Sequence, residues 1–167
     1  MHSRIFHIMP TLEDVQNNTK SYDDYSLESI GADYIVETGD WSNDIDWLMQ
    51  MLPEGMFTME KITIKEDEDT IKEFAKLTYT NFPTKYLEKW IQDIKDYASI
   101  LSIDKLKEAY SMWLFRELVK NNDNSFYIDQ GDLYADLSNC HDWIVSVANR
   151  NKIGDTFYIG SIMDYHF

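Results

Sequence analysis

The sequence predicts an α+β protein, with a small mixed or antiparallel sheet built from its terminal segments and an α-helical hairpin in its middle. Runs rich in β-branched and aromatic residues lie toward both ends of the chain. Between them, apolar residues recur at the spacing of amphipathic helices. Strands at the two ends with helices between them are typical of the α+β class.

The first strand covers residues 3–9 and ends at Pro10, which cannot donate to a ladder. Residues 11–25 are polar and are expected to form a loop or a short turn. Residues 26–35 fit a short helix, although Gly31 weakens that pattern and leaves a strand open.

Three further elements precede the helical hairpin. Ser42 is expected to cap a helix that runs to about Leu52. Residues 56–65 alternate as a strand. The acidic run 66–69 is expected to open a helix over residues 70–80, because carboxylates stabilise a helix N-terminus.

Two longer helices form the predicted hairpin. The first carries apolar residues from Leu87 to Leu101, and the second is capped by Ser102 and carries them from Leu106 to Leu118. A strand, a helix and a final strand are expected to follow, over residues 125–129, 139–149 and 156–166.

The charge of the chain is unevenly distributed. The 167 residues include 30 Asp and Glu against 15 Lys and Arg, a formal charge of −15. Residues 1–60 carry −10, residues 61–120 carry zero and residues 121–167 carry −5. We expect one domain, in which residues 1–65 and 121–167 form an acidic α/β part and residues 66–120 a charge-neutral helical part.

This composition excludes several classes of protein. No apolar run approaches the roughly 20 residues of a membrane span, and the N-terminus has no signal-peptide pattern. The single cysteine, Cys140, cannot form an internal disulfide, which favours a reducing, cytoplasmic location. Strong negative charge disfavours direct binding of nucleic acid or of acidic membranes.

No motif in the chain predicts catalysis, and no cofactor or metal is expected. In Cys140-His141-Asp142 the three side chains would point about 100° apart on a helix, so they cannot align as nucleophile, base and orienting acid. The histidines lack zinc-ligand spacing, although His7 and His166 would approach each other if the terminal strands paired.

The segment from Glu28 to Glu54 differs from the rest, because it contains seven acids and no base. Carboxylates four residues apart on a helix, or two residues apart on a strand, are separated by a distance within range of the phosphate repeat of a nucleic-acid strand. An exposed tryptophan in the segment would add a binding hot spot. The candidate partner-binding residues are Glu28, Asp33, Glu37, Asp40, Trp41, Asp44 and Asp46. Alternatively, the tryptophans belong to the core and the acids form a solvated face.

Three short strings, over residues 3–8, 29–34 and 44–48, resemble the small acidic accessory proteins of mobile elements. Some of those proteins are antirestriction or anti-CRISPR inhibitors, and several are thought to act as DNA mimics. The resemblance covers about the first third of the chain, and it assigns no role to an individual residue.

These observations predict an acidic inhibitory protein that blocks a basic nucleic-acid-binding partner, such as a Cas or restriction nuclease. One alternative is an immunity protein that neutralises a basic toxin. Another is a metal-dependent enzyme with ligands from distant segments. The oligomeric state is left open, a homodimer included.

Overall fold

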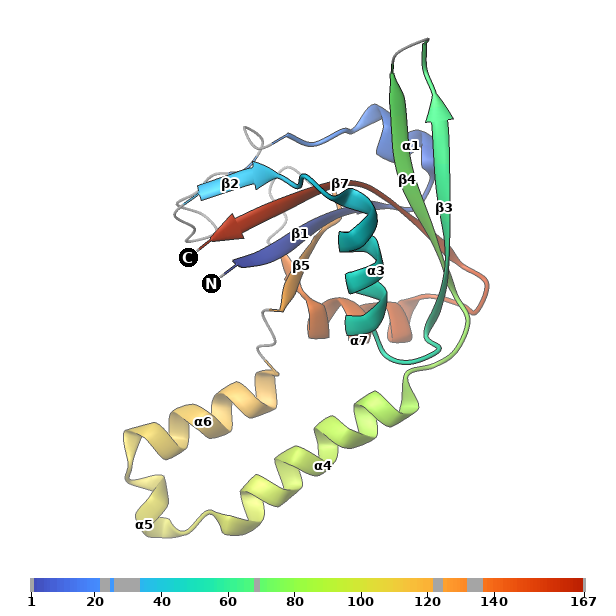
Figure 1. Ribbon diagram of the computed structural model, residues 1–167. Helices are drawn as coiled ribbons and strands as arrows, with labels where there is room; N and C mark the ends of the chain where they lie inside the picture. Colours follow the sequence, from blue (N-terminus) through green and yellow to red (C-terminus); the bar gives the residue numbers. More distant parts are fainter. Residues whose placement is uncertain are drawn as a thin grey trace.

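The computed structural model describes residues 2–21, 25, 34–67, 70–121, 125–131 and 137–166. Over these ranges the chain forms a seven-stranded mixed sheet with helices packed on it and a helical arm that extends away from it (Figure 1). The predicted α+β class is confirmed.

The strands are β1 (His2–Met9), β2 (Tyr34–Glu37), β3 (Phe57–Lys65), β4 (Ile71–Tyr79), β5 (Phe126–Asp129), β6 (Ser138–Asn139) and β7 (Thr156–His166). The helices are α1 (Leu12–Asn17), α3 (Trp41–Met51), α4 (Thr84–Ile100), α5 (Ile103–Leu106), α6 (Ala109–Lys120) and α7 (Cys140–Arg150).

Strand β7 is the centre of the sheet, whose order is β3-β4-β7-β1-β5-β6. One edge of β7 pairs with β1, and the other edge pairs with β4 along its first half and with β2 along its second half. Strands β1 and β5 are parallel, and the remaining described pairs are antiparallel. The terminal strands therefore build the sheet, as the sequence predicts.

Helices cover both faces of the sheet. On one face, α3 and α7 contribute Ile45, Leu48, Trp143 and Ile144 to the main apolar core, where they pack with Phe6 and other strand residues. On the other face, α1 places the buried Val15 against Gly160 and Phe74. A smaller buried cluster lies on that second face, formed by Ile5, Met163 and Tyr165.

The helix predicted over residues 70–80 is wrong, because this segment is the strand β4. Its apolar residues Phe74, Ala75 and Leu77 match a helical spacing, but β4 lies between β3 and β7 with side chains buried on both faces. A strand covered on both faces loses the alternation that distinguishes it from a helix. Of the acids before it, Glu66 and Asp67 follow β3, and Thr70 N donates to the Asp67 carboxylate, whereas Glu68 and Asp69 lie outside the described residues.

Smaller differences concern the N-terminal third. The predicted loop after Pro10 contains α1, which Thr11 caps by accepting from Asp14 N. Asp40, and not Ser42, caps α3. Residues 34–37 form β2, and the rest of the segment predicted as a short helix or strand lies outside the described residues.

The predicted helical hairpin is confirmed, and we call α4, α5 and α6 (residues 84–120) the arm (Figure 1). Two hydrogen bonds join its long helices: Trp90 Nε1 donates to Leu118 O at 3.0 Å and Tyr97 Oη donates to Ser111 O at 3.2 Å. No residue of α4 is buried. Because β4 belongs to the sheet, the helical part begins at residue 84 and not at residue 66.

The base of the arm is attached to α7 through His141. This buried imidazole lies with its Nδ1 2.8 Å from Tyr86 Oη and 2.7 Å from Asn121 Nδ2. The ring of Trp90 contacts it edge-on, with 4.5 Å between centroids. His141 is thus a structural residue at the junction of three helices.

Candidate partner-binding surface

Helix α3 carries most of the described residues predicted to bind a partner. Asp40 begins the helix by accepting a hydrogen bond from Asn43 N at 3.2 Å, which satisfies one of its free amide groups. The apolar side of the helix buries Ile45 and Leu48 against the sheet. That packing directs Asp40 and Asp46 into solvent, where both are exposed.

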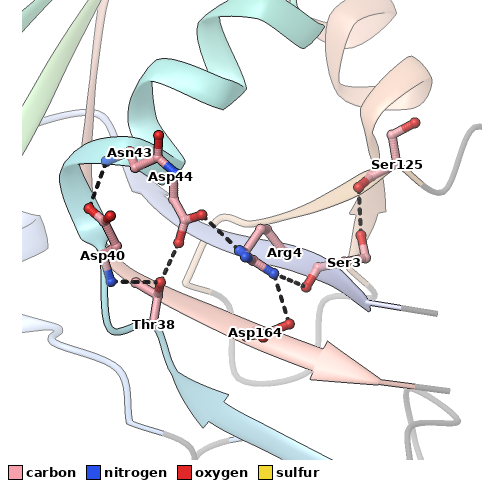
Figure 2. Close-up of polar contacts among 8 residues, drawn as sticks. All are labelled: Ser3, Arg4, Thr38, Asp40, Asn43, Asp44, Ser125 and Asp164. Carbon is pink, nitrogen blue, oxygen red and sulfur yellow. Dashed lines mark hydrogen bonds and ion pairs between the residues drawn. The ribbon is translucent and has the colours of Figure 1, made fainter.

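Asp44 does not face solvent, because Arg4 from β1 reaches across to it (Figure 2). Arg4 Nε donates to Asp44 Oδ1 at 2.9 Å, and Arg4 Nη1 donates to Asp164 Oδ1 of β7 at 2.8 Å. The hydroxyl of Thr38 donates to the second oxygen of Asp44. The Asp44 side chain is only 8% exposed, so this carboxylate links α3 to the sheet and contributes nothing to an acidic surface.

Asp46 is exposed but it is also paired. Lys61 of β3 places its Nζ 2.8 Å from Asp46 Oδ1, and the same Nζ donates to Ser42 Oγ at 2.6 Å. The segment between Glu28 and Glu54 contains no base, yet the fold brings Arg4 and Lys61 to it from outside. Two of its seven carboxylates thereby gain a basic partner, the buried Asp44 and the exposed Asp46.

Trp41 packs against the core. Its Nε1 donates to Gly160 O at 2.7 Å. This carbonyl lies on β7 between the stretch that pairs with β4 and the stretch that pairs with β2. The indole N–H therefore donates a hydrogen bond at a position where neither strand pairs with β7. Trp47 is also a packing residue, with its ring 6.4 Å from that of Phe6. The alternative that these tryptophans belong to the core fits the structure better than an exposed hot spot.

Glu37 is exposed, but it lies on the opposite face of the sheet from the α3 acids. In the β-sheet register Glu37 is opposite Met163, whereas Val36 is opposite Asp164. Successive side chains of a strand point to opposite faces. Glu37 therefore shares the face of Met163, and Asp164 shares the face covered by α3. Glu28 and Asp33 lie outside the described residues.

A small pocket of about 250 Å³ lies beside the Arg4 network, lined by Ser3, Arg4, Asn43, Asp44 and Trp47. Its one guanidinium is shared by two carboxylates, which leaves a net charge of −1 around it. The sequence did not indicate Arg4, Asp164 or Lys61 as members of this region, because their positions here depend on long-range strand pairing.

Among the described residues, no group of three His, Cys, Asp or Glu side chains is arranged to hold a metal ion. His7 and His166 lie on the paired strands β1 and β7, but the strand register places His166 opposite His2. None of the described helices is both long enough and apolar enough to cross a membrane.

The predicted residues thus fall into three groups: two exposed acids at the start and in the first half of α3 (Asp40 and Asp46), one exposed acid on the other face (Glu37), and two packing residues, the buried Asp44 and the partly buried Trp41. Comparison with protein-family models, with curated proteins and with solved structures finds no match to this chain.

Proposed function

We propose that this protein is an acidic inhibitory binding protein, which occupies the nucleic-acid groove of a basic defence protein such as a Cas or restriction nuclease and acts in the cytoplasm. The observation that carries the proposal is the division of charge between the two parts of the fold. The arm holds seven Lys and Arg against six acids, a net of +1, and the rest of the sequence holds eight against 24, a net of −16.

The negative charge outside the arm supports this proposal in two ways. A body of this charge attracts basic partners at long range and accelerates their association. It also repels nucleic acid, so that it competes for the partner's groove without binding the partner's substrate. Among the candidate residues, Glu37, Asp40 and Asp46 present exposed carboxylates on two sides of the sheet.

The test is a binding assay with purified restriction and CRISPR nucleases, performed with and without competing duplex DNA. Two variants remove charge from exposed positions: Asp40→Asn with Asp46→Asn on one side, and Glu37→Gln on the other. Asparagine retains the capping function of position 40. The matched control, Glu88→Gln with Asp96→Asn, removes two charges from exposed positions of the arm.

We expect DNA to displace the protein from its target, and we expect the α3 double variant to bind about tenfold more weakly, a loss of about 1.4 kcal/mol. The arm control should bind as the unmodified chain does. Capture of a nuclease that neither DNA nor the charge variants affect would contradict mimicry. High-affinity binding of a basic toxin, with no binding of nucleases, would favour the immunity-protein alternative.

A further inference from the structure

The far end of the arm carries an exposed apolar cluster, which we call the tip. It consists of Ile100, Ile103, Leu106, Tyr110 and Trp113, whose residues are between 46% and 77% exposed. The rings of Tyr110 and Trp113 stack with 5.9 Å between their centroids. The five residues expose on the order of 600 Å², which is the upper end of the range for an apolar patch on a monomer.

A second feature, with both apolar and polar lining residues, lies at the near end of the arm, where the chain leaves the sheet. A cleft of about 600 Å³ opens there between the end of α3 and the start of α4. Its apolar lining includes Met51, Pro53, Phe82 and Pro83, and Phe82 is 51% exposed. We call this feature the base cleft.

The tip and the base cleft are separated by the length of α4. This helix has 17 residues, which corresponds to about 25 Å at 1.5 Å per residue. The tip of one chain therefore cannot fill its own cleft. In a two-fold antiparallel pair of arms, however, each tip arrives at the base cleft of the other chain, because one arm length separates the two features in both copies.

The charge of the arm favours the same orientation. The half of the arm near the sheet, residues 84–92 and 114–120, holds four bases and two acids, a net of +2. The far half, residues 93–113, holds three bases and four acids, a net of −1. An antiparallel pair places each positive half beside a negative half. It also keeps the two strongly acidic sheet bodies at opposite ends, where their repulsion is weakest.

We propose that the arm is a homodimerisation device, and that two copies of the chain pack their arms antiparallel so that each tip occupies the base cleft of its partner. The exposed area of the tip, with Met51 and Phe82 added, is about 800 Å² per chain, the amount that a standard interface buries on each side. A second copy is the occupant that this arrangement fits, because it supplies an exposed apolar tip at the matching distance and the complementary charge together.

The first experiment measures molar mass by sedimentation velocity over a concentration series up to about 100 µM. The unmodified chain should sediment as a dimer that dissociates on dilution. Ile103→Asp at the tip and Phe82→Asp in the base cleft should each sediment as a monomer. Ile153→Asp is the matched control, because Ile153 is 68% exposed in the turn before β7 and should leave the dimer intact. Circular dichroism verifies that each variant is folded.

A second experiment tests the orientation with a short bis-maleimide crosslinker. The native Cys140 is buried, and new cysteines are placed at the tip in one chain (Ile103→Cys) and beside the cleft in another (Thr84→Cys). An equimolar mixture should give crosslinked dimers, and either variant alone should not. Crosslinking of the Ile103→Cys chain alone would mean that tips meet tips, which would overturn the antiparallel arrangement.

A monomer at every concentration would overturn the proposal altogether. If such a monomer floated with phosphatidylcholine vesicles and Ile103→Asp abolished flotation, the tip would be assigned to a membrane surface instead. Neither result would bear on the proposed inhibition, whose test positions 37, 40 and 46 lie outside the arm.

Discussion

Arg4 connects two carboxylates that are far apart in the sequence, Asp44 on α3 and Asp164 on β7. Because the Asp44 side chain is 8% exposed, its charge has lost most of its hydration and depends on the guanidinium. Lys61 and Asp46 form the contrasting pair, with side chains that are 34% and 54% exposed. The two pairs have similar distances, and burial is what distinguishes their contributions.

Replacing Arg4 by Met should therefore lower the free energy of unfolding by about 2–3 kcal/mol, because it leaves a buried carboxylate without a counter-ion. The same replacement at Lys61 should cost less than about 1 kcal/mol, since water solvates both of its partners. Urea unfolding of the two variants measures the difference. Equal losses would mean that the Arg4 pair is no more desolvated than the surface pair.

The candidate site residues show which features of individual residues could be predicted from the sequence. A base-free acidic segment is visible in the chain, and Asp40 and Asp46 are exposed as a solvated surface requires. The burial of Asp44 could not be predicted, because it depends on a basic residue that the pairing of β1 with β7 brings near. Only a contact between distant segments would have revealed it.

At the scale of elements, β4 shows where local pattern is insufficient. Its sequence has helical spacing and follows an acidic run, so both local signals indicate a helix. The segment is a strand because β3 and β7 pair with it on either side. By contrast α3, α7 and the long helices of the arm were predicted well, because each buries or pairs a single apolar face and its period is preserved.

Gly160 of β7 shows how closely α1 packs on the sheet. A Cβ added there would lie 2.7 Å from Val15 Cγ2, a contact that a short, branched side chain cannot relieve by rotation. We expect Gly160→Ala to lower the free energy of unfolding by about 1–3 kcal/mol through overpacking.

The double variant Gly160→Ala with Val15→Ala should lose less stability than the sum of the two single variants, with a coupling energy of about 1 kcal/mol. The measurement is a double-mutant cycle from urea unfolding. Simple additivity would show that the methyl group added at position 160 does not meet Val15.

At the scale of the whole molecule, buried tyrosines contribute to the packing on both faces of the sheet. Burial raises the pKa of Tyr165 strongly, and burial also raises the pKa of Tyr127 and Tyr79. In the unfolded chain these phenols ionise near pH 10. Above that pH the unfolded state releases protons that the folded state retains, so the free energy of unfolding falls as the pH rises.

The loss should begin near pH 10 and approach about 1.4 kcal/mol per pH unit for each retained proton. Tyr165→Phe should reduce this slope, and Tyr34→Phe, at an exposed position of β2, is the control. Urea unfolding between about pH 8 and pH 11 provides the measurement. An unchanged slope for Tyr165→Phe would contradict a role of this phenol in alkaline unfolding.

The central position of β7 has a consequence for how the protein is made. Strands β1, β2 and β4 each require an edge of β7, yet β7 follows all of them in the chain, and Ile5 has no antiparallel neighbour until Met163 has been synthesised. The helices of the arm contact each other within residues 84–120, which are synthesised well before β7, and only the base of the arm also needs His141 of α7. During translation, a finished helical hairpin would precede a sheet whose strands still have open edges, and such edges invite aggregation. We therefore expect the nascent strands to be most prone to aggregation in the interval before β7 is synthesised.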